Sequence, residues 1–353
     1  MDTNRRKTLT ALAGAALYPL FAPSVPALAG EDVHNGSPPV NIIIPRDYQP
    51  PVGEHADPDF GYKLSKATLD YIDKAYGNRI LPIWGKRQTE IDLEKRIVNI
   101  VYWVLQGVRE HQHIYPVDPV WVVSQIMGES FFYEFAVSWA FAVGVCQFIP
   151  YTGKAYDMLC ATEKEEHFHP PFQKTEFAGS YEKYWEVKKK LRNLRRKHSS
   201  HDSITEERMQ EALEAIVNGQ DLQNAAEQLN YLQQKQELRK ALNKERQNFR
   251  KYLQANFHNR NIFNNKDLEF LLGFDERVTY NKPIRAMVLM LAQGLRARNG
   301  NILASAAGFQ AGLSNTREKG YYSAYGRIPS FDSTVTYISR LLVNHYEISS
   351  RLS

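Results

Sequence analysis

One carboxyl group in this sequence is set apart by its surroundings. Glu129 follows an apolar helical pattern, directly precedes Ser130, Phe131 and Phe132, and is followed by a dense apolar stretch at 139–149. Apolar neighbours disfavour the charged form of a carboxyl group and raise its pKa towards neutrality. Such a group can donate a proton and take one back, which is general acid–base chemistry. The alternative is that Glu129 caps a helix or forms an ion pair, the common role of a glutamate.

Nine residues around Glu129 occur at a spacing that forms a recognisable motif. They are Glu129, Ser130, Ala136, Ser138, Ala142, Gly144, Gln147, Pro150 and Thr152. Without a gap, they coincide with a family signature that reads Glu-Ser, then Ala-x-Ser, then Gly-Ala-x-Gly-Leu-Met-Gln-x-Met-Pro-x-Thr. The chain therefore resembles the soluble lytic murein transglycosylases. A Glu-Ser pair alone is a worthless signal, whereas nine matches at fixed spacing are a specific one.

Two later segments resemble the same family in the same order. Residues 308–312 stand where the family has Ala-Tyr-Asn-Ala-Gly, and residues 330–338 stand where it has Pro-Phe-x-Glu-Thr-x-x-Tyr-Val. Phe274-Asp275 resembles the link between these parts. The resemblance covers about 93–160 and 271–348.

The chain also departs from the family pattern. Phe141 replaces a glycine, Cys146 a methionine, Phe309 a tyrosine, Gln310 an asparagine and Ser333 a glutamate. Phe141 could crowd the turn after the catalytic helix. The changes at 309 and 310 put contacts with sugar in doubt, but they leave the acid in place. They indicate a divergent member and leave room for altered specificity.

The resemblance implies cleavage of the β-1,4 bond between N-acetylmuramic acid and N-acetylglucosamine in peptidoglycan strands, with no metal or cofactor. Most glycosidases use two carboxyl groups. The family is thought to use one: Glu129 would protonate the leaving oxygen while the N-acetyl group of the substrate stabilises the cation. The same Glu129, now a base, would then take the proton of the 6-hydroxyl and close a 1,6-anhydro ring.

The resemblance also implies roles for other side chains. Tyr337 would hydrogen-bond the catalytic carboxyl group, although a tyrosine in an apolar helix is more often part of a core. Gln147 would line the cleft and bind N-acetyl groups, or its amide would be buried on backbone atoms. Ser138, Phe309 and Gln310 would contact the substrate, and Ser138 could instead only brace a turn.

Two other functions remain compatible with these residues. A muramidase would hydrolyse the same bond, and only a transglycosylase leaves 1,6-anhydromuramyl ends. A wall-binding or assembly protein could have kept the fold and lost activity. The substitutions at 309, 310 and 333 favour that reading, while intact Glu129 and Gln147 oppose it.

The elements that must position Glu129 are helical. Asp118 can accept a free backbone N–H at a helix start, and Pro119 suits the first helical position, so a helix should run to Glu129-Ser130. We expect a mainly α, lysozyme-like transglycosylase domain built from 63–160 and 273–353. Its other helices are expected at about 64–76, 89–112, 283–297, from about 302, and at 333–345.

The stretch 161–272 is polar and is expected to be an inserted helical hairpin. Ser203 with Glu206 resembles a capping box, and Asp221 can cap a long helix reaching Phe257. Residues 181–260 hold 17 Lys and Arg against 11 Asp and Glu, an excess of six. This basic excess could meet an acidic protein or another anionic envelope partner, although most charge runs are simply solvated.

The N-terminus reads as an export signal. Arg5-Arg6, an uncharged stretch and Ala27-Leu28-Ala29 predict a signal peptide over 1–29, with the twin-arginine and ordinary secretory routes both open. A Pro-rich arm is expected over 30–62. No later stretch is apolar enough to span a membrane, so we expect a periplasmic protein of a Gram-negative bacterium.

The net charge and the cysteine and histidine patterns bear on nucleic-acid binding, disulfide formation and metal binding. The net charge of +5 is too mild to indicate nucleic acid. Cys146 and Cys160 could pair in an oxidising compartment, or both could remain free thiols. The His111/His113 and His167/His169 pairs have metal-ligand spacing, but no carboxylate pattern completes a site, and solvated positions are favoured.

Overall fold

The computed structural model describes residues 42–53, 57–198, 206–219, 223–321 and 323–352. The described chain is mainly helical, and its extended segments meet only in isolated β-bridges, which confirms the predicted mainly α class. None of the described helices has both the length and the apolar character needed to cross a membrane. The signal peptide predicted over 1–29 lies outside the described residues.

The chain divides into two compact units, which are described separately. The first comprises the residues up to Cys160 together with Arg260–Ser353, and the second comprises Ala161–Asn259. The insert was expected to extend to residue 272, but its last part belongs to the first unit. The reason is packing: Ile262 is buried in the core of that unit, and Arg260 pairs with Asp267 at 2.9 Å.

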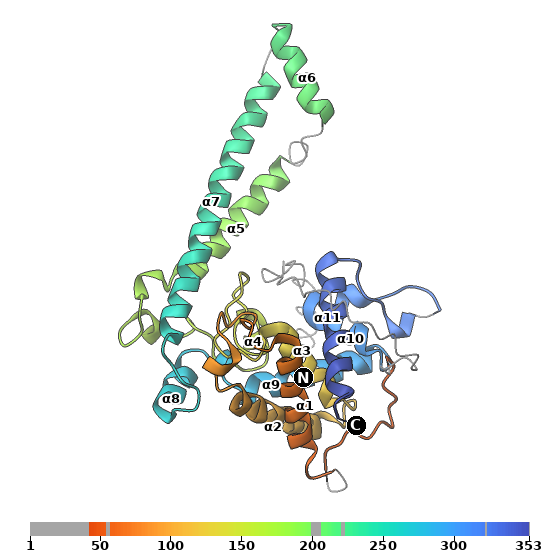
Figure 1. Cartoon of the computed structure of the whole chain (residues 1–353). Helices are drawn as coiled ribbons and strands as arrows, with labels where there is room; N and C mark the ends of the chain where they lie inside the picture. Colours follow the sequence, from red (N-terminus) through yellow and green to blue (C-terminus); the bar gives the residue numbers. More distant parts are fainter. Residues whose placement is uncertain (1–41, 54–56, 199–205, 220–222, 322, 353) are drawn as a thin grey trace, which may run out of the picture. The chain divides into compact units, whose positions relative to one another are not determined.

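The first unit consists of helices around one hydrophobic core (Figure 1). Its α-helices are α1 Phe60–Tyr76, α2 Leu93–His111, α3 Pro119–Ser130, α4 Pro150–Ala155, α8 Asn265–Phe274, α9 Asn281–Ala297, α10 Ile302–Ala311 and α11 Asp332–Ser349. Short 3-10 segments are η2 Gln88–Glu90, η6 Glu276–Val278, η7 Leu313–Thr316 and η8 Ser323–Tyr325. The predicted helices are present, with ends shifted by a few residues.

Helix α3 forms the centre of the first unit. It begins as expected, with the Asp118 carboxylate accepting from Val120 N at 2.9 Å and Pro119 in the first turn. Ten of its twelve residues are buried, and α2 and α11 pack against it. A helix enclosed this completely holds the side chains near its end in fixed positions.

The apolar stretch after α3 forms an irregular loop. Isolated bridges join Val143 to Val137 and to Phe148. Pro150, where the apolar stretch was expected to end, is the first residue of α4. Residues 136–148 are called the signature loop below, because they contain most of the motif.

The described part of the predicted Pro-rich arm packs against other segments of the first unit. Residues 30–41 lie outside the described part of the chain. Ile44 is buried, its N–H donates to Gly300 O at 2.9 Å, and its carbonyl accepts from the Tyr115 hydroxyl at 2.7 Å. Since α1 already begins at Phe60, the arm ends slightly before residue 62.

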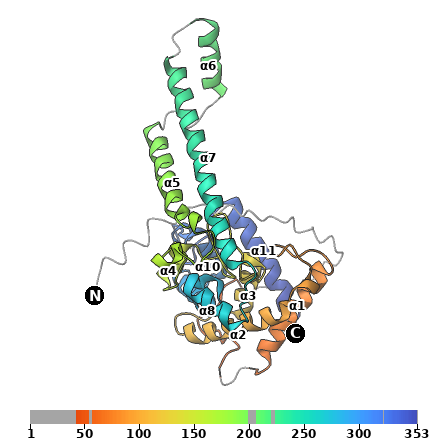
Figure 2. The ribbon, with the colours of Figure 1, turned by 90° about the vertical axis from the view of Figure 1, so that its left-hand side faces the viewer.

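The second unit contains a helical hairpin. Its elements are η3 Glu165–Phe168, η4 Thr175–Phe177, α5 Ser180–Lys197, α6 Glu206–Val217 and α7 Gln223–Phe257. Helices α5 and α7 lie side by side (Figure 2). Helix α6 lies in the chain between the last residue of α5 and the first residue of α7. Tyr184, Leu191 and Phe249 are buried in the hairpin. The predicted caps Ser203 and Asp221 lie outside the described residues.

Candidate active site

Glu129 lies at the end of the most enclosed helix of the molecule. It is the residue before the last of α3, and Phe131 ends the helix in the left-handed conformation with φ 51°. Phe131 and Phe132 are both buried beside it. Glu129 itself keeps only partial access to solvent. The helix therefore presents one carboxyl group at the boundary between an apolar interior and the outside.

The surroundings of Glu129 favour its protonated form. Burial raises the pKa of its carboxyl group from 4.5 to about 7, and the Tyr337 hydroxyl lowers it by a smaller amount. No second carboxylate is among the described groups that shift this pKa. A carboxyl group with a pKa near neutrality can serve as acid and as base at the same pH.

Tyr337 faces Glu129 from α11. Its own pKa is raised well above the ordinary value by burial and by the nearby Glu129 carboxylate. The hydroxyl is buried and makes no hydrogen bond of standard geometry to a described residue. The two groups are therefore within interaction range, but the hydrogen bond between them is not tight.

Polar contacts fix α11 against α3. Asn344 Nδ2 donates to Ser124 O at 3.2 Å, and His345 Nε2 lies 2.9 Å from Asp118 Oδ2. The His345 ring stacks on Trp121 with the centroids 4.2 Å apart. These contacts, spread along α3, set the register that brings Tyr337 to Glu129.

Removing the Tyr337 hydroxyl should change both rate and pH dependence. We expect Tyr337→Phe to lower the cleavage rate by one to a few orders of magnitude, each factor of ten being about 1.4 kcal/mol. Since the hydroxyl lowers the Glu129 pKa, its loss should raise that pKa and shift the alkaline limb of the rate profile to higher pH. Tyr346→Phe, at an exposed position of α11, is the control for pH–rate measurements. An unchanged profile would mean that Tyr337 is only packing.

Ser138 and Gln147 hold the signature loop together. Ser138 Oγ accepts from Ala142 N at 2.9 Å and from Ala140 N at 3.2 Å. Gln147 Nε2 donates to Gly144 O at 2.8 Å and to Ala136 O at 3.2 Å. The Gln147 amide nitrogen thus bonds to backbone atoms, while the side chain remains partly exposed.

Ser130 joins this loop to the end of α3. Its hydroxyl donates to Val145 O at 2.9 Å and lies 3.2 Å from Ile126 O. The neighbouring Cys146 thiol is buried, and burial and the Glu129 charge both raise its pKa. The motif thus places the signature loop beside the Glu129 carboxyl group.

Arg277 is a residue that the sequence reasoning missed. Its guanidinium is fully buried, pairs with Asp275 at 2.6 Å, and donates to Phe141 O at 2.8 Å and Phe148 O at 2.9 Å. It therefore fastens two points of the signature loop to η6. The sequence feature that could have pointed to Arg277 was Asp275, two residues earlier. In the sequence, Asp275 stood out only because Phe274-Asp275 resembles a linking segment of the family.

Phe141 occupies a position that suits glycine. Its φ is +64°, in the left-handed region, and its side chain is buried. The sequence indicated crowding at this turn. The Arg277 bond to Phe141 O is among the contacts that hold this residue in a conformation that disfavours large side chains.

Gly144 passes so close to Arg277 that no side chain fits. A Cβ there would fall 1.8 Å from Arg277 O, and the residue has φ +84°. We expect Gly144→Ala to lower the free energy of unfolding by at least about 2 kcal/mol through overlap and backbone strain. Gly273→Ala in α8, where a Cβ meets nothing within 4 Å, is the control for chemical denaturation. Equal stability of the two variants would contradict the close approach.

Phe309 and Gln310 lie on α10 with partial exposure. The Phe309 ring lies 5.7 Å from that of Phe148 in the signature loop. Gln310 Oε1 accepts from the Thr334 hydroxyl at 2.7 Å, which ties α10 to α11. The structure thus connects Phe309 to the signature loop and gives Gln310 a bracing contact.

A second buried carboxylate belongs to an ion pair. Glu134 is fully buried and pairs with Arg96 at 2.8 Å. The Arg96 guanidinium lies 5.2 Å from the Trp84 ring centroid. Glu134 thus has a buried cation as its partner, which contrasts with Glu129.

The cysteines and the two His-x-His pairs lie among the described residues. Cys146 and Cys160 are both buried and are not joined in a disulfide. His113 Nδ1 lies 2.9 Å from Glu110 O, and His167 is buried with its ring against Phe172. The described residues contain no group of three His, Cys, Asp or Glu side chains placed to hold a metal ion.

Comparisons of the chain with models of protein families, with curated proteins and with solved structures found no match.

Proposed function

We propose that this protein is a lytic transglycosylase that cleaves peptidoglycan between N-acetylmuramic acid and N-acetylglucosamine. The observation that carries the proposal is the Glu129 carboxyl group, whose pKa of about 7 and partner Tyr337 suit alternation between acid and base. The residue motif that surrounds Glu129 supports the substrate class. A lysozyme-like fold and a periplasmic location belong to the same proposal.

In the proposed reaction, protonated Glu129 donates its proton to the glycosidic oxygen as the bond from C1 breaks. The N-acetyl oxygen of the muramyl residue forms a bond to C1 and takes up the positive charge. The Glu129 carboxylate then removes the proton of the 6-hydroxyl, whose oxygen displaces the N-acetyl oxygen at C1. The products are a free hydroxyl on one sugar and a 1,6-anhydro ring on the other, and Glu129 ends protonated.

Hydrolysis by a muramidase is the nearest alternative, since the same acid would serve it. Glycosidases that hydrolyse usually place a second carboxylate within about 5–9.5 Å of the acid. Among the described residues, the buried Glu134 is held by Arg96 and does not shift the Glu129 pKa. This favours the reaction with one carboxyl group.

Product analysis tests the proposal. Purified peptidoglycan is incubated with the full chain, and the fragments are examined by mass spectrometry. We expect 1,6-anhydromuramyl ends, lighter by one water molecule than hydrolysed ends. Reducing muramyl ends would establish the muramidase instead. Binding to wall sacculi without any cleavage would establish a non-catalytic wall-binding protein.

In this proposal, an anionic envelope partner binds to the basic surface of the second unit. Helix α5 carries eight Lys and Arg against two Glu, and most of the basic residues are exposed. Opposite charges across a surface speed encounter and orient the partners. Weaker binding of the full chain to sacculi after Lys189→Glu and Arg192→Glu would support this role.

A further inference from the structure

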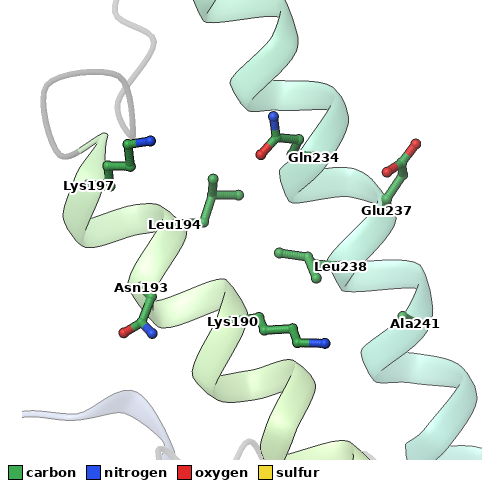
Figure 3. Close-up of a pocket in the computed structure, with 8 residues that line it drawn as sticks. All are labelled: Lys190, Asn193, Leu194, Lys197, Gln234, Glu237, Leu238 and Ala241. Atoms are coloured by element: carbon green, nitrogen blue, oxygen red, sulfur yellow. The ribbon is translucent and has the colours of Figure 1, made fainter.

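Helices α5 and α7 diverge to leave a groove of about 620 Å³ between them. Leu194 and Leu238 face each other across the groove, and Ala241 adds apolar surface (Figure 3). The polar lining residues are Lys190, Asn193, Lys197, Gln234 and Glu237. A groove with an apolar floor and two lysines against one glutamate at its edges fits an amphipathic helix of negative charge.

Helix α6 has the properties of such a helix. Met209, Leu213 and Ile216 stand at positions i, i+4 and i+7, the spacing with which a helix places anchors in a groove. They are 54%, 58% and 56% exposed, so the structure leaves this apolar face uncovered. By sequence, α6 holds four Glu and one Arg, whereas α5 and α7 are both strongly basic. The chain therefore contains a groove and a complementary helix, and none of the residues that line the groove belongs to α6.

The chain length between the elements disfavours insertion of α6 into its own groove. Gln234 is the lining residue nearest the start of α7, 11 residues after Gln223 or about 16 Å along the helix. A helix packed alongside lies about 8–10 Å to the side. The link of five residues after Val217 spans at most about 21 Å, so it would have to be almost fully extended. A groove on another molecule imposes no such limit.

We propose that two copies of this chain associate by reciprocal exchange, with α6 of each copy in the α5–α7 groove of the other. Exchange of an identical element gives a closed two-fold dimer and fills two grooves at once. The Met209, Leu213 and Ile216 side chains would cover Leu194 and Leu238, and the acidic helix would offset the charge of Lys190 and Lys197. This association is independent of the proposed enzymatic function.

Light scattering and sedimentation of the full chain test the association. We expect a concentration-dependent dimer. Leu213→Glu and Leu238→Glu should each give monomers, and Lys190→Glu should weaken the dimer at least tenfold. Lys189→Glu is the matched control, because this exposed lysine of α5 does not line the groove. A monomer at all concentrations would overturn the proposal.

Cysteine cross-linking shows whether the α6 helix in the groove comes from the other copy or from the same chain. A Leu213→Cys chain mixed with a Leu194→Cys chain should form a covalent dimer on oxidation, since the two native cysteines are buried. A cross-link found only within the double variant Leu194→Cys/Leu213→Cys would overturn exchange in favour of the chain's own helix. Binding of monomers to lipid vesicles through Leu213, without cross-linked dimers, would overturn it in favour of a membrane surface.

Discussion

Replacing Glu129 by glutamine is expected to abolish measurable cleavage of purified peptidoglycan while the protein stays folded. The amide has nearly the same shape but cannot donate or accept the catalytic proton, and loss of a general acid costs roughly 10²–10⁴ in rate or more. In the wild type, the rate should fall as pH rises through about 7, because only the protonated carboxyl group can start the reaction. Turnover of the variant at the wild-type rate would remove Glu129 from the mechanism.

The same substitution should increase stability at alkaline pH. The pKa of Glu129 is about 7 in the folded protein and about 4.5 when the chain is unfolded. Between these values the folded state binds more protons than the unfolded state, so stability falls as pH rises from about 4.5 to 7. The loss amounts to about 3 kcal/mol at 1.36 kcal/mol for each pKa unit. Because glutamine does not ionise, the Glu129→Gln variant does not lose this stability as the pH rises.

Thermal and chemical unfolding of the two proteins at pH 4 and pH 8 measure this difference. Similar stabilities at pH 4 and a more stable Glu129→Gln variant at pH 8 are expected. Glu94→Gln changes an exposed carboxylate of α2 and controls for the loss of a negative charge. If the Glu129 variant is less stable than the wild type at both pH values, the carboxyl group is structural.

Replacing Arg277 by methionine should have the largest effect on stability. The change leaves Asp275 buried without its cation and removes one hydrogen bond from each of the carbonyls of Phe141 and Phe148. Breaking a buried ion pair from one side costs about 3–5 kcal/mol, because the remaining charge cannot be solvated. We also expect a loss of activity, since the signature loop beside Glu129 would lose two of its attachments.

A double-mutant cycle separates the ion pair from the loop attachment. Asp275→Asn with Arg277→Met should cost less than the sum of the single changes, since it removes both charges. Arg285→Met breaks an exposed pair with Glu110 and should cost less than about 1 kcal/mol. Chemical denaturation gives these values. A cost for Arg277→Met as small as that for Arg285→Met would show that the buried pair does not hold the loop.

The sequence by itself determined the helical elements near Glu129. Asp118 and Pro119 define the start of α3, and the apolar pattern up to Glu129 defines its burial, because capping and helical periodicity are local properties. The long helix ending at Phe257 could be predicted for the same reason. The apolar neighbours of Glu129 also pointed to a raised pKa before any packing was known.

Only the tertiary structure decided which distant residues reach this carboxyl group. Tyr337 lies about two hundred residues away, and its approach depends on the contacts of Asn344 and His345 with α3. Nothing in the local pattern showed that Arg277 fastens the signature loop, or that the amide of Gln147 is used on backbone atoms. The physical reason is that helix starts and burial patterns depend on neighbours in sequence, whereas hydrogen bonds and desolvation depend on neighbours in space.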